Sequence, residues 1–127
     1  MLRAAALVGL LVTASTVQAQ SLTAIAGHPV KLYTGYSTNP DCTSEGDLQV
    51  RVTQAPQHGR ITVKTAGVFP NFPASNVRSA CNRRRVPGVL VHYVSERGYS
   101  GFDQLGFQVI FPNGASRTFS GSVTVQP

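Results

Sequence analysis

The sequence predicts a small protein built entirely from β-strands and folded as a sandwich of two sheets. Apolar and polar residues alternate along most of the chain, and clusters of Gly, Pro and Asn separate most of the alternating segments. No segment shows the helical period. In the clearest segment, Leu105, Phe107, Val109 and Phe111 alternate with other residues after a glycine-rich turn at residues 98–103. This pattern is typical of a strand with one buried face.

We expect about seven antiparallel strands, at residues 21–26, 30–36, 47–53, 60–64, 89–94, 105–111 and 117–125. The first is expected at a sheet edge. The fifth is expected in the centre of a sheet, because it is apolar on both faces. The residues expected to be buried are Val50, Val52, Ile61, Val63, Val91, Tyr93, Leu105, Phe107, Val109 and Val123. Residues 65–85 form a long connection, and long loops often carry function.

The first 19 residues have the composition of a secretory signal peptide. Met1–Arg3 is a short basic start, and residues 4–12 form an apolar run that is too short to cross a bilayer. Val17 and Ala19 occupy the positions that signal peptidase reads. We expect cleavage after Ala19, which leaves one domain at residues 20–127, in the periplasm or outside the cell. No later segment is long and apolar enough to be a transmembrane helix.

Cys42 and Cys81 are the only cysteines of the chain. In an exported protein, two cysteines predict one disulfide bond. The bond would close a loop of about 40 residues and stabilise the fold by roughly 4 kcal/mol. The alternative is a metal-binding or redox pair, but the spacing is not C-x-x-C and no His lies near either cysteine in the sequence. We therefore expect a structural disulfide.

Two motifs resemble those of the bacterial Ig-like and cadherin-like repeat modules. They are the Pro-x-His-Gly turn at residues 56–59 and the Gly-Tyr-x-Gly-x-Asp strand entry at residues 98–103. The resemblance covers residues 48–125 and implies an Ig-like β-sandwich that serves as a spacer, adhesion or binding unit. Ser95 stands where these modules usually have Pro, and the cysteine pair is not part of their pattern.

The residues of the strand-entry motif have a structural interpretation. Gly98 and Gly101 permit backbone conformations that are closed to other residues. Tyr99 is expected to pack over the turn, and Asp103 is expected to accept hydrogen bonds from N–H groups of its own turn. Calcium binding, as in true cadherins, is the alternative. It needs several clustered carboxylates, and the only local cluster is Asp41, Glu45 and Asp47.

The three histidines are scattered along the chain. His58 precedes Gly59 in the Pro-x-His-Gly turn, where its ring is expected to cap a backbone carbonyl. His92 lies on the strand face opposite Val91 and Tyr93, and His28 lies in an N-terminal turn. A copper or zinc site would need two or three of them to converge, and nothing in their spacing brings them together. No serine lies in the context of a catalytic nucleophile, so we expect no catalytic residues and no metal site.

Charge is the remaining signal for function. The chain has 11 Lys and Arg against five Asp and Glu, which gives a net charge of +6 with neutral His. Arg83, Arg84 and Arg85 follow Cys81 closely, and Arg78 precedes it, so the disulfide would hold a basic loop on the sandwich. A solvated loop is one interpretation, and contact with a polyanion is the other.

We therefore expect a secreted or periplasmic interaction module with no catalysis and no cofactor. Its candidate anion-binding residues are Arg78, Arg83, Arg84 and Arg85. Its expected partner is an unknown protein or an anionic component of the cell envelope, and export argues against nucleic acid. The alternative is a small secreted metal-binding protein or enzyme that uses His58 and His92.

Overall fold

The computed structural model describes residues 9, 11 and 19–127. All seven segments expected from the alternation form strands. The elements of this part of the chain are β1 (Ala19–Ile25), β2 (Val30–Tyr36), β3 (Gln49–Gln54), β4 (Gly59–Val68), the short 3-10 helix η1 (Ser79–Arg83), β5 (Val86–Ser95), β6 (Gly101–Ile110) and β7 (Ser116–Gln126).

The expected signal peptide lies outside the described residues except for positions 9, 11 and 19. Within the described residues, no helix has the length and hydrophobicity that a membrane span requires.

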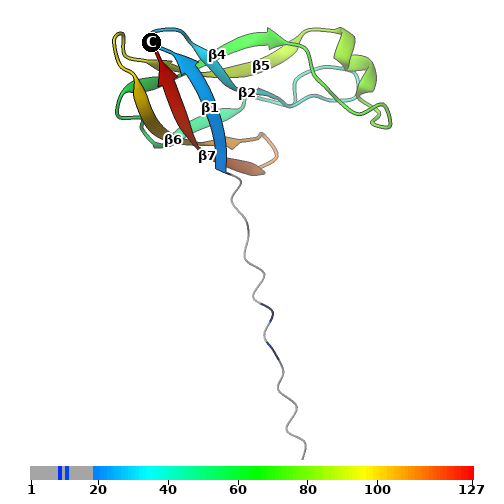
Figure 1. Ribbon diagram of the computed structural model, residues 1–127. Coiled ribbons are helices and arrows are strands. Elements are labelled where there is room, and N and C mark those ends of the chain that lie inside the picture. Colours follow the sequence, from blue (N-terminus) through cyan, green and yellow to red (C-terminus); the bar gives the residue numbers. More distant parts are fainter. Residues whose placement is uncertain (1–8, 10, 12–18) are drawn as a thin grey trace, which may run out of the picture.

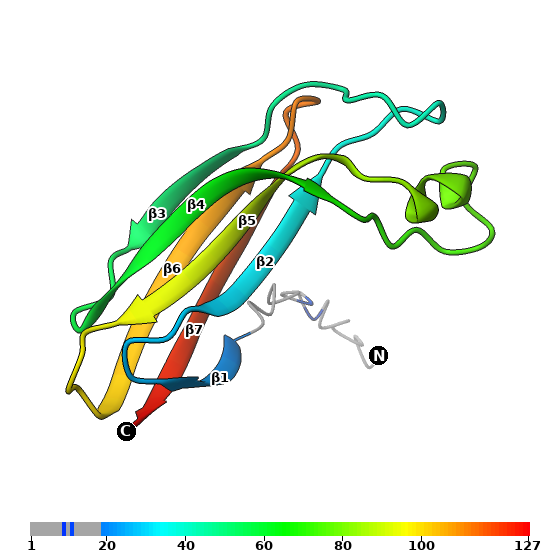
Figure 2. The same cartoon turned by 90° about the horizontal axis from the view of Figure 1, so that it is seen from above.

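The strands form two sheets that face each other, which confirms the predicted all-β sandwich (Figures 1 and 2). One sheet has four strands in the order β1-β7-β6-β3, and the other has three in the order β2-β5-β4. As expected, β5 is central and β1 lies at an edge. One pairing departs from the antiparallel expectation, because β1 runs parallel to β7. The chain leaves β1 for the other sheet, so β1 has no hairpin partner and instead meets the last strand.

The core lies between the two sheets. Six of the residues expected to be buried are indeed buried, since each points inward from a strand that has neighbours on both sides: Val91, Tyr93, Leu105, Phe107, Val109 and Val123. Val50 and Ile61 are only partly buried and pack against this core. The alternation therefore identified the inner face correctly for the central strands.

The expected burial of Val52 and Val63 is wrong. Val52 lies opposite Phe107 in the β3–β6 ladder, and Val63 lies opposite Val91 in the β4–β5 ladder. Both valines therefore pair directly with a core residue of the neighbouring strand. Even so, Val52 is 47% exposed and Val63 is 48% exposed. The reason is that β3 and β4 are edge strands, whose outer flank has no neighbouring strand to cover the side chain.

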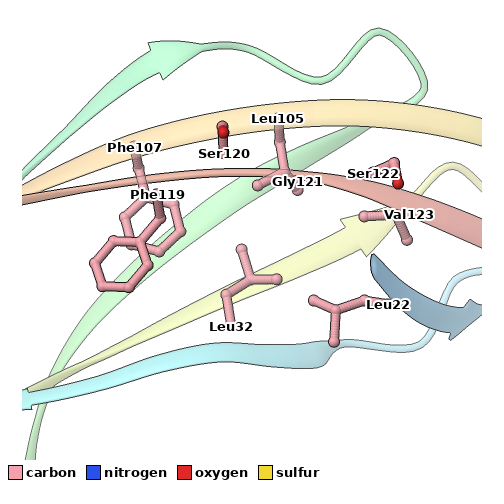
Figure 3. Close-up of a pocket in the computed structure, with 9 residues that line it drawn as sticks. All are labelled: Leu22, Leu32, Leu105, Phe107, Phe119, Ser120, Gly121, Ser122 and Val123. Atoms are coloured by element: carbon pink, nitrogen blue, oxygen red, sulfur yellow. The ribbon is translucent and has the colours of Figure 1, made fainter. Parts of the chain in front are cut away.

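A small apolar hollow lies between the sheets near β1 and β2. Figure 3 shows the side chains of Leu22, Leu32, Leu105 and Phe119 pointing into this space. Its volume is about 20 Å³, which is room for about one water molecule. We therefore regard it as a packing gap of the core and not as a ligand site.

Two long connections project beyond the ends of the sheets (Figures 1 and 2). They are residues 37–47, between β2 and β3, and residues 69–85, between β4 and β5, and we call them together the disulfide lobe. The second connection is shorter than expected, because β4 continues to Val68 and β5 begins at Val86. It contains η1, a five-residue helix that is too short to show a helical period in the sequence.

Candidate functional site

The disulfide lobe is held together by the predicted bond between Cys42 and Cys81, whose Cα atoms lie 5.5 Å apart. Cys81 belongs to η1 and is fully buried, whereas Cys42 lies in the first connection of the lobe. Cys42 has a φ of 71°, a left-handed conformation that is rare for a residue with a side chain. The bond joins two segments that are 39 residues apart in the sequence, and it lies just before the basic run that starts at Arg83, the last residue of η1.

Arg78 reinforces this junction from inside the lobe. Its Nε donates a hydrogen bond to the backbone oxygen of Thr38 (2.6 Å), and its guanidinium lies 3.7 Å from a carboxylate oxygen of Glu45. Both partners belong to the first connection, so Arg78 ties the two halves of the lobe together. The sequence grouped Arg78 with the three arginines that follow Cys81, but the structure separates it from them and gives it internal partners.

The second connection is also fixed to itself and to β2. Asn82 and Phe72 exchange two hydrogen bonds, from the Phe72 N–H to Asn82 Oδ1 (2.8 Å) and from Asn82 Nδ2 to the Phe72 oxygen (2.9 Å). The Asn71 N–H donates to the Tyr36 hydroxyl (2.9 Å), and the rings of Tyr36 and Phe72 meet edge to face. These contacts give the long connection a defined shape although it contains only one turn of helix.

Arg83, Arg84 and Arg85 are all exposed, as the sequence predicts. Within residues 19–127 none of the three forms a salt bridge. The guanidinium of Arg85 lies over the ring of Phe69, 5.4 Å from its centroid, a cation–π contact at the start of the same connection. Phe69 itself is 55% exposed, so the arginines lie beside an accessible apolar ring.

The acidic residues of the lobe have local partners. Glu45 faces Arg78, and Asp41 accepts hydrogen bonds from the backbone N–H (3.1 Å) and the hydroxyl (2.6 Å) of Thr43. The hydrogen bond from the Thr43 hydroxyl lowers the pKa of Asp41. In the described part of the chain, no three His, Cys, Asp or Glu side chains lie close enough together to hold a metal ion.

The turn at residues 56–59 and the glycine-rich turn at residues 98–103 meet at the opposite end of the sandwich, around Asp103. Asp103 lies on the inner side of β6 and is only 4% exposed. Its carboxylate accepts four hydrogen bonds, from the N–H groups of Gln57 (2.9 Å), His58 (3.0 Å) and Gln104 (2.9 Å) and from the hydroxyl of Tyr93 (2.7 Å). The expectation that Asp103 binds its own turn is therefore wrong, since two of these donors belong to the turn between β3 and β4.

Ring stacking between His58 and Tyr99 also connects the two turns. Tyr99 stacks on His58, with ring centroids 3.9 Å apart, so it covers the other turn as well as its own. The Tyr99 hydroxyl donates to the backbone oxygen of Phe102 (2.6 Å). Gly59 is required by close approach, because a Cβ there would lie 2.5 Å from the Val94 oxygen. We call His58, Gly59, Tyr93, Tyr99 and Asp103 the turn cluster.

Burial and hydrogen bonding shift the pKa of Asp103 in opposite directions. Desolvation by burial raises the pKa of Asp103, but the hydrogen bonds from Tyr93 and from the backbone outweigh it, so the pKa is below the usual value. Burial, followed by the hydrogen bond to the carboxylate, raises the pKa of Tyr93. The pair therefore remains carboxylate and phenol at neutral pH, and its chemistry is that of a structural anchor.

His58 and His92 do not converge. His58 is stacked in the turn cluster, whereas His92 lies opposite Thr62 and Lys31 on the outer side of the three-stranded sheet. The structure thus brings together the residues of the two motifs but does not bring His58 and His92 to one site. The residues that the sequence did not single out are Tyr93 as the partner of Asp103, Asn82 as a clamp of the lobe, and the exposed rings of Phe69 and Phe102.

Comparison with known proteins adds little to this geometry. No family model matches the chain, and no curated protein matches it. Among solved structures, the solution structure of Amebosin matches with 18% identity and a TM-score of 0.44, over 84% of this chain and 88% of that one.

Proposed function

We propose that this protein is a non-enzymatic binding module whose disulfide lobe contacts an anionic membrane surface. The observation that carries the proposal is the run of Arg83, Arg84 and Arg85, three consecutive exposed cations without a salt bridge in residues 19–127. Consecutive arginines that no acidic side chain neutralises create a local positive field. Arginine also binds phosphate oxygens in a bidentate manner, which lysine does not do.

The rigidity of the lobe supports binding. The disulfide, the Arg78 contacts and the Asn82–Phe72 hydrogen bonds fix the segment that carries the arginines. A segment that is already ordered loses less conformational entropy when it binds than a free loop would. The disulfide also supports export, because such bonds persist in oxidising compartments.

The apolar residues of the lobe favour a lipid surface over an acidic polysaccharide. Val77 is 74% exposed and Phe69 is 55% exposed, and both belong to the same connection as the arginines. Apolar side chains beside basic ones suit the boundary between headgroups and acyl chains, where both kinds of contact are favourable. A polysaccharide chain would use the charges but would leave Val77 in water.

Vesicle co-sedimentation tests the proposal. We expect the protein to bind vesicles that contain phosphatidylglycerol, to ignore pure phosphatidylcholine, and to dissociate as NaCl is raised. Each arginine near an anionic surface contributes about 1 kcal/mol, so replacing Arg83, Arg84 and Arg85 by Ser should weaken binding by roughly a hundredfold.

A control variant removes the same charge from another surface. Lys31, Arg60 and Lys64 are exposed cations on the strands of the three-stranded sheet, and we replace all three by Ser. This control should bind within about threefold of the wild type, because charges outside the contact act only through a screened field. An equal loss in both variants would contradict the proposal, and so would binding to immobilised acidic polysaccharide but not to vesicles.

A further inference from the structure

The outer face of the four-stranded sheet differs from the rest of the molecule in its chemistry. Most of its outward-pointing residues carry hydroxyl or carboxamide groups: Ser21, Thr23, Gln49, Gln54, Gln104, Gln108, Ser116, Thr118, Ser120, Ser122 and Thr124. Ile25, which is 56% exposed, and Ile110 are aliphatic side chains on the same face, at its margins. Among the described residues, Arg51 is the only charged side chain on this face. The protein as a whole carries a net charge of +6, so the neutrality of this face is a local property.

Phe102 stands at one end of this neutral face. It lies opposite Thr124 in the β6–β7 ladder and is 75% exposed. The hydrogen bond from the Tyr99 hydroxyl to its backbone oxygen (2.6 Å) fixes its position at the start of β6. Covering this exposed phenyl ring removes apolar surface from water, so a partner that covers it binds with a more favourable free energy.

A hollow lies beside this ring. It is lined by Gln54, Ala55, Gln57, Phe102, Asp103 and Gln104 and has a volume of about 400 Å³, within the range of small-ligand sites. The carboxylate of Asp103 is already occupied by its four donors. Within residues 19–127, no hydrogen bond engages the side-chain amides of Gln54, Gln57 or Gln104. The hollow therefore offers an apolar ring and three carboxamides that are open to a ligand.

We infer that this hollow and the adjoining neutral face bind a neutral glycan. A pyranose ring has an apolar C–H face, which suits the negative face of an aromatic ring, and a rim of hydroxyl groups that both donate and accept. Carboxamides also donate and accept, so they match hydroxyls without a net charge. An anionic ligand would gain nothing from this hollow, which presents no cation. The rows of Ser and Thr that continue along β7 suit further sugar units of the same chain.

Titration calorimetry with cellohexaose, chitohexaose and maltohexaose tests the inference. We expect at least one of these neutral hexasaccharides to bind, more tightly than its disaccharide, and with an affinity that is unchanged in about 0.5 M NaCl, where charge effects are screened. Phe102→Ala should weaken binding about tenfold or more, because it removes the stacking surface. Phe69→Ala, which removes the exposed ring of the lobe, should bind as the wild type does.

The inference does not rest on the function proposed for the lobe. The variant in which Arg83, Arg84 and Arg85 are Ser should bind the hexasaccharide normally, so a failure of one proposal leaves the other standing. Absence of binding to all three hexasaccharides would overturn the inference, as would unchanged binding by Phe102→Ala. Sedimentation that shows a wild-type dimer and a monomeric Phe102→Ala would also overturn it, because a second copy of the chain would then cover the face.

Discussion

Asp103, at the end of the glycine-rich turn at residues 98–103, connects this turn to the turn at residues 56–59. Its four hydrogen bonds come from a strand, from its own backbone neighbour and from the turn between β3 and β4. A buried carboxylate without partners would be costly, so these donors are what permit it to lie on the inner side of β6. Ser95 has a comparable role, since its hydroxyl accepts a hydrogen bond from the Gly27 N–H (3.1 Å).

We predict that Asp103→Asn destabilises the fold by about 2–4 kcal/mol at neutral pH. An amide has one acceptor oxygen, and its NH₂ group would face N–H donors that the carboxylate now accepts. The pKa of Asp103 is lowered by folding, so its contribution is complete above the unfolded-state pKa of about 3.9 and is lost as pH falls through the lower folded value. Stability of the wild type should therefore fall with acidification below about pH 4, whereas the variant should lose less over that range.

Urea titrations from neutral to acidic pH measure both effects. Tyr93→Phe is a second variant with a smaller expected loss of stability, because it removes one of the four donors to Asp103 and keeps the ring. It should lie between the wild type and Asp103→Asn in stability. The same acid dependence in wild type and Asp103→Asn would show that another group controls acid unfolding.

The sequence predicts that residues 56–59 and 98–103 form turns, but it does not predict which residues the side chains of the turn cluster contact. The positive φ of Gly101 (136°) agrees with the expected turn. Two of the four donors to Asp103, however, lie 45 and 46 residues away in the sequence, and nothing in a local pattern indicates which turn a carboxylate will contact. The same holds for Arg78, whose partners Thr38 and Glu45 are brought to it by the disulfide.

At the level of strands, the alternation predicts the face of each side chain but not its depth. All seven strands were predicted, and central strands behaved as expected. The two errors in burial, Val52 and Val63, are both on edge strands. Which strand lies at an edge depends on the order of strands in the sheets, and that order is set by contacts across the whole chain.

This distinction predicts unequal effects of mutation. Phe107 is 2% exposed and stacks on Phe119, so Phe107→Ala should destabilise the fold by about 3–5 kcal/mol. Val63→Ala should cost less than about 1 kcal/mol, because half of the side chain is already in water. Chemical denaturation of the two variants beside the wild type checks the difference. Similar losses of stability in both would mean that the β4 edge is covered in solution.

Across the whole molecule, charge and polarity are segregated by surface. The disulfide lobe carries the consecutive arginines with exposed apolar residues, and the outer face of the four-stranded sheet is nearly uncharged. Exposure of the arginines was predictable, because unpaired guanidinium groups are too costly to bury. The hollow at Phe102 was not, because it is assembled from β3, the following turn and β6.

Tryptophan fluorescence measures most directly which surface meets a membrane. The chain contains no tryptophan, so Phe69→Trp and Phe102→Trp each provide a single reporter, one on the disulfide lobe and one on the neutral face. With vesicles that contain phosphatidylglycerol, we predict a blue shift and quenching by brominated lipid for Phe69→Trp, and neither change for Phe102→Trp. A response of Phe102→Trp alone, or no response of Phe69→Trp under conditions where the protein co-sediments with the vesicles, would contradict binding through the disulfide lobe.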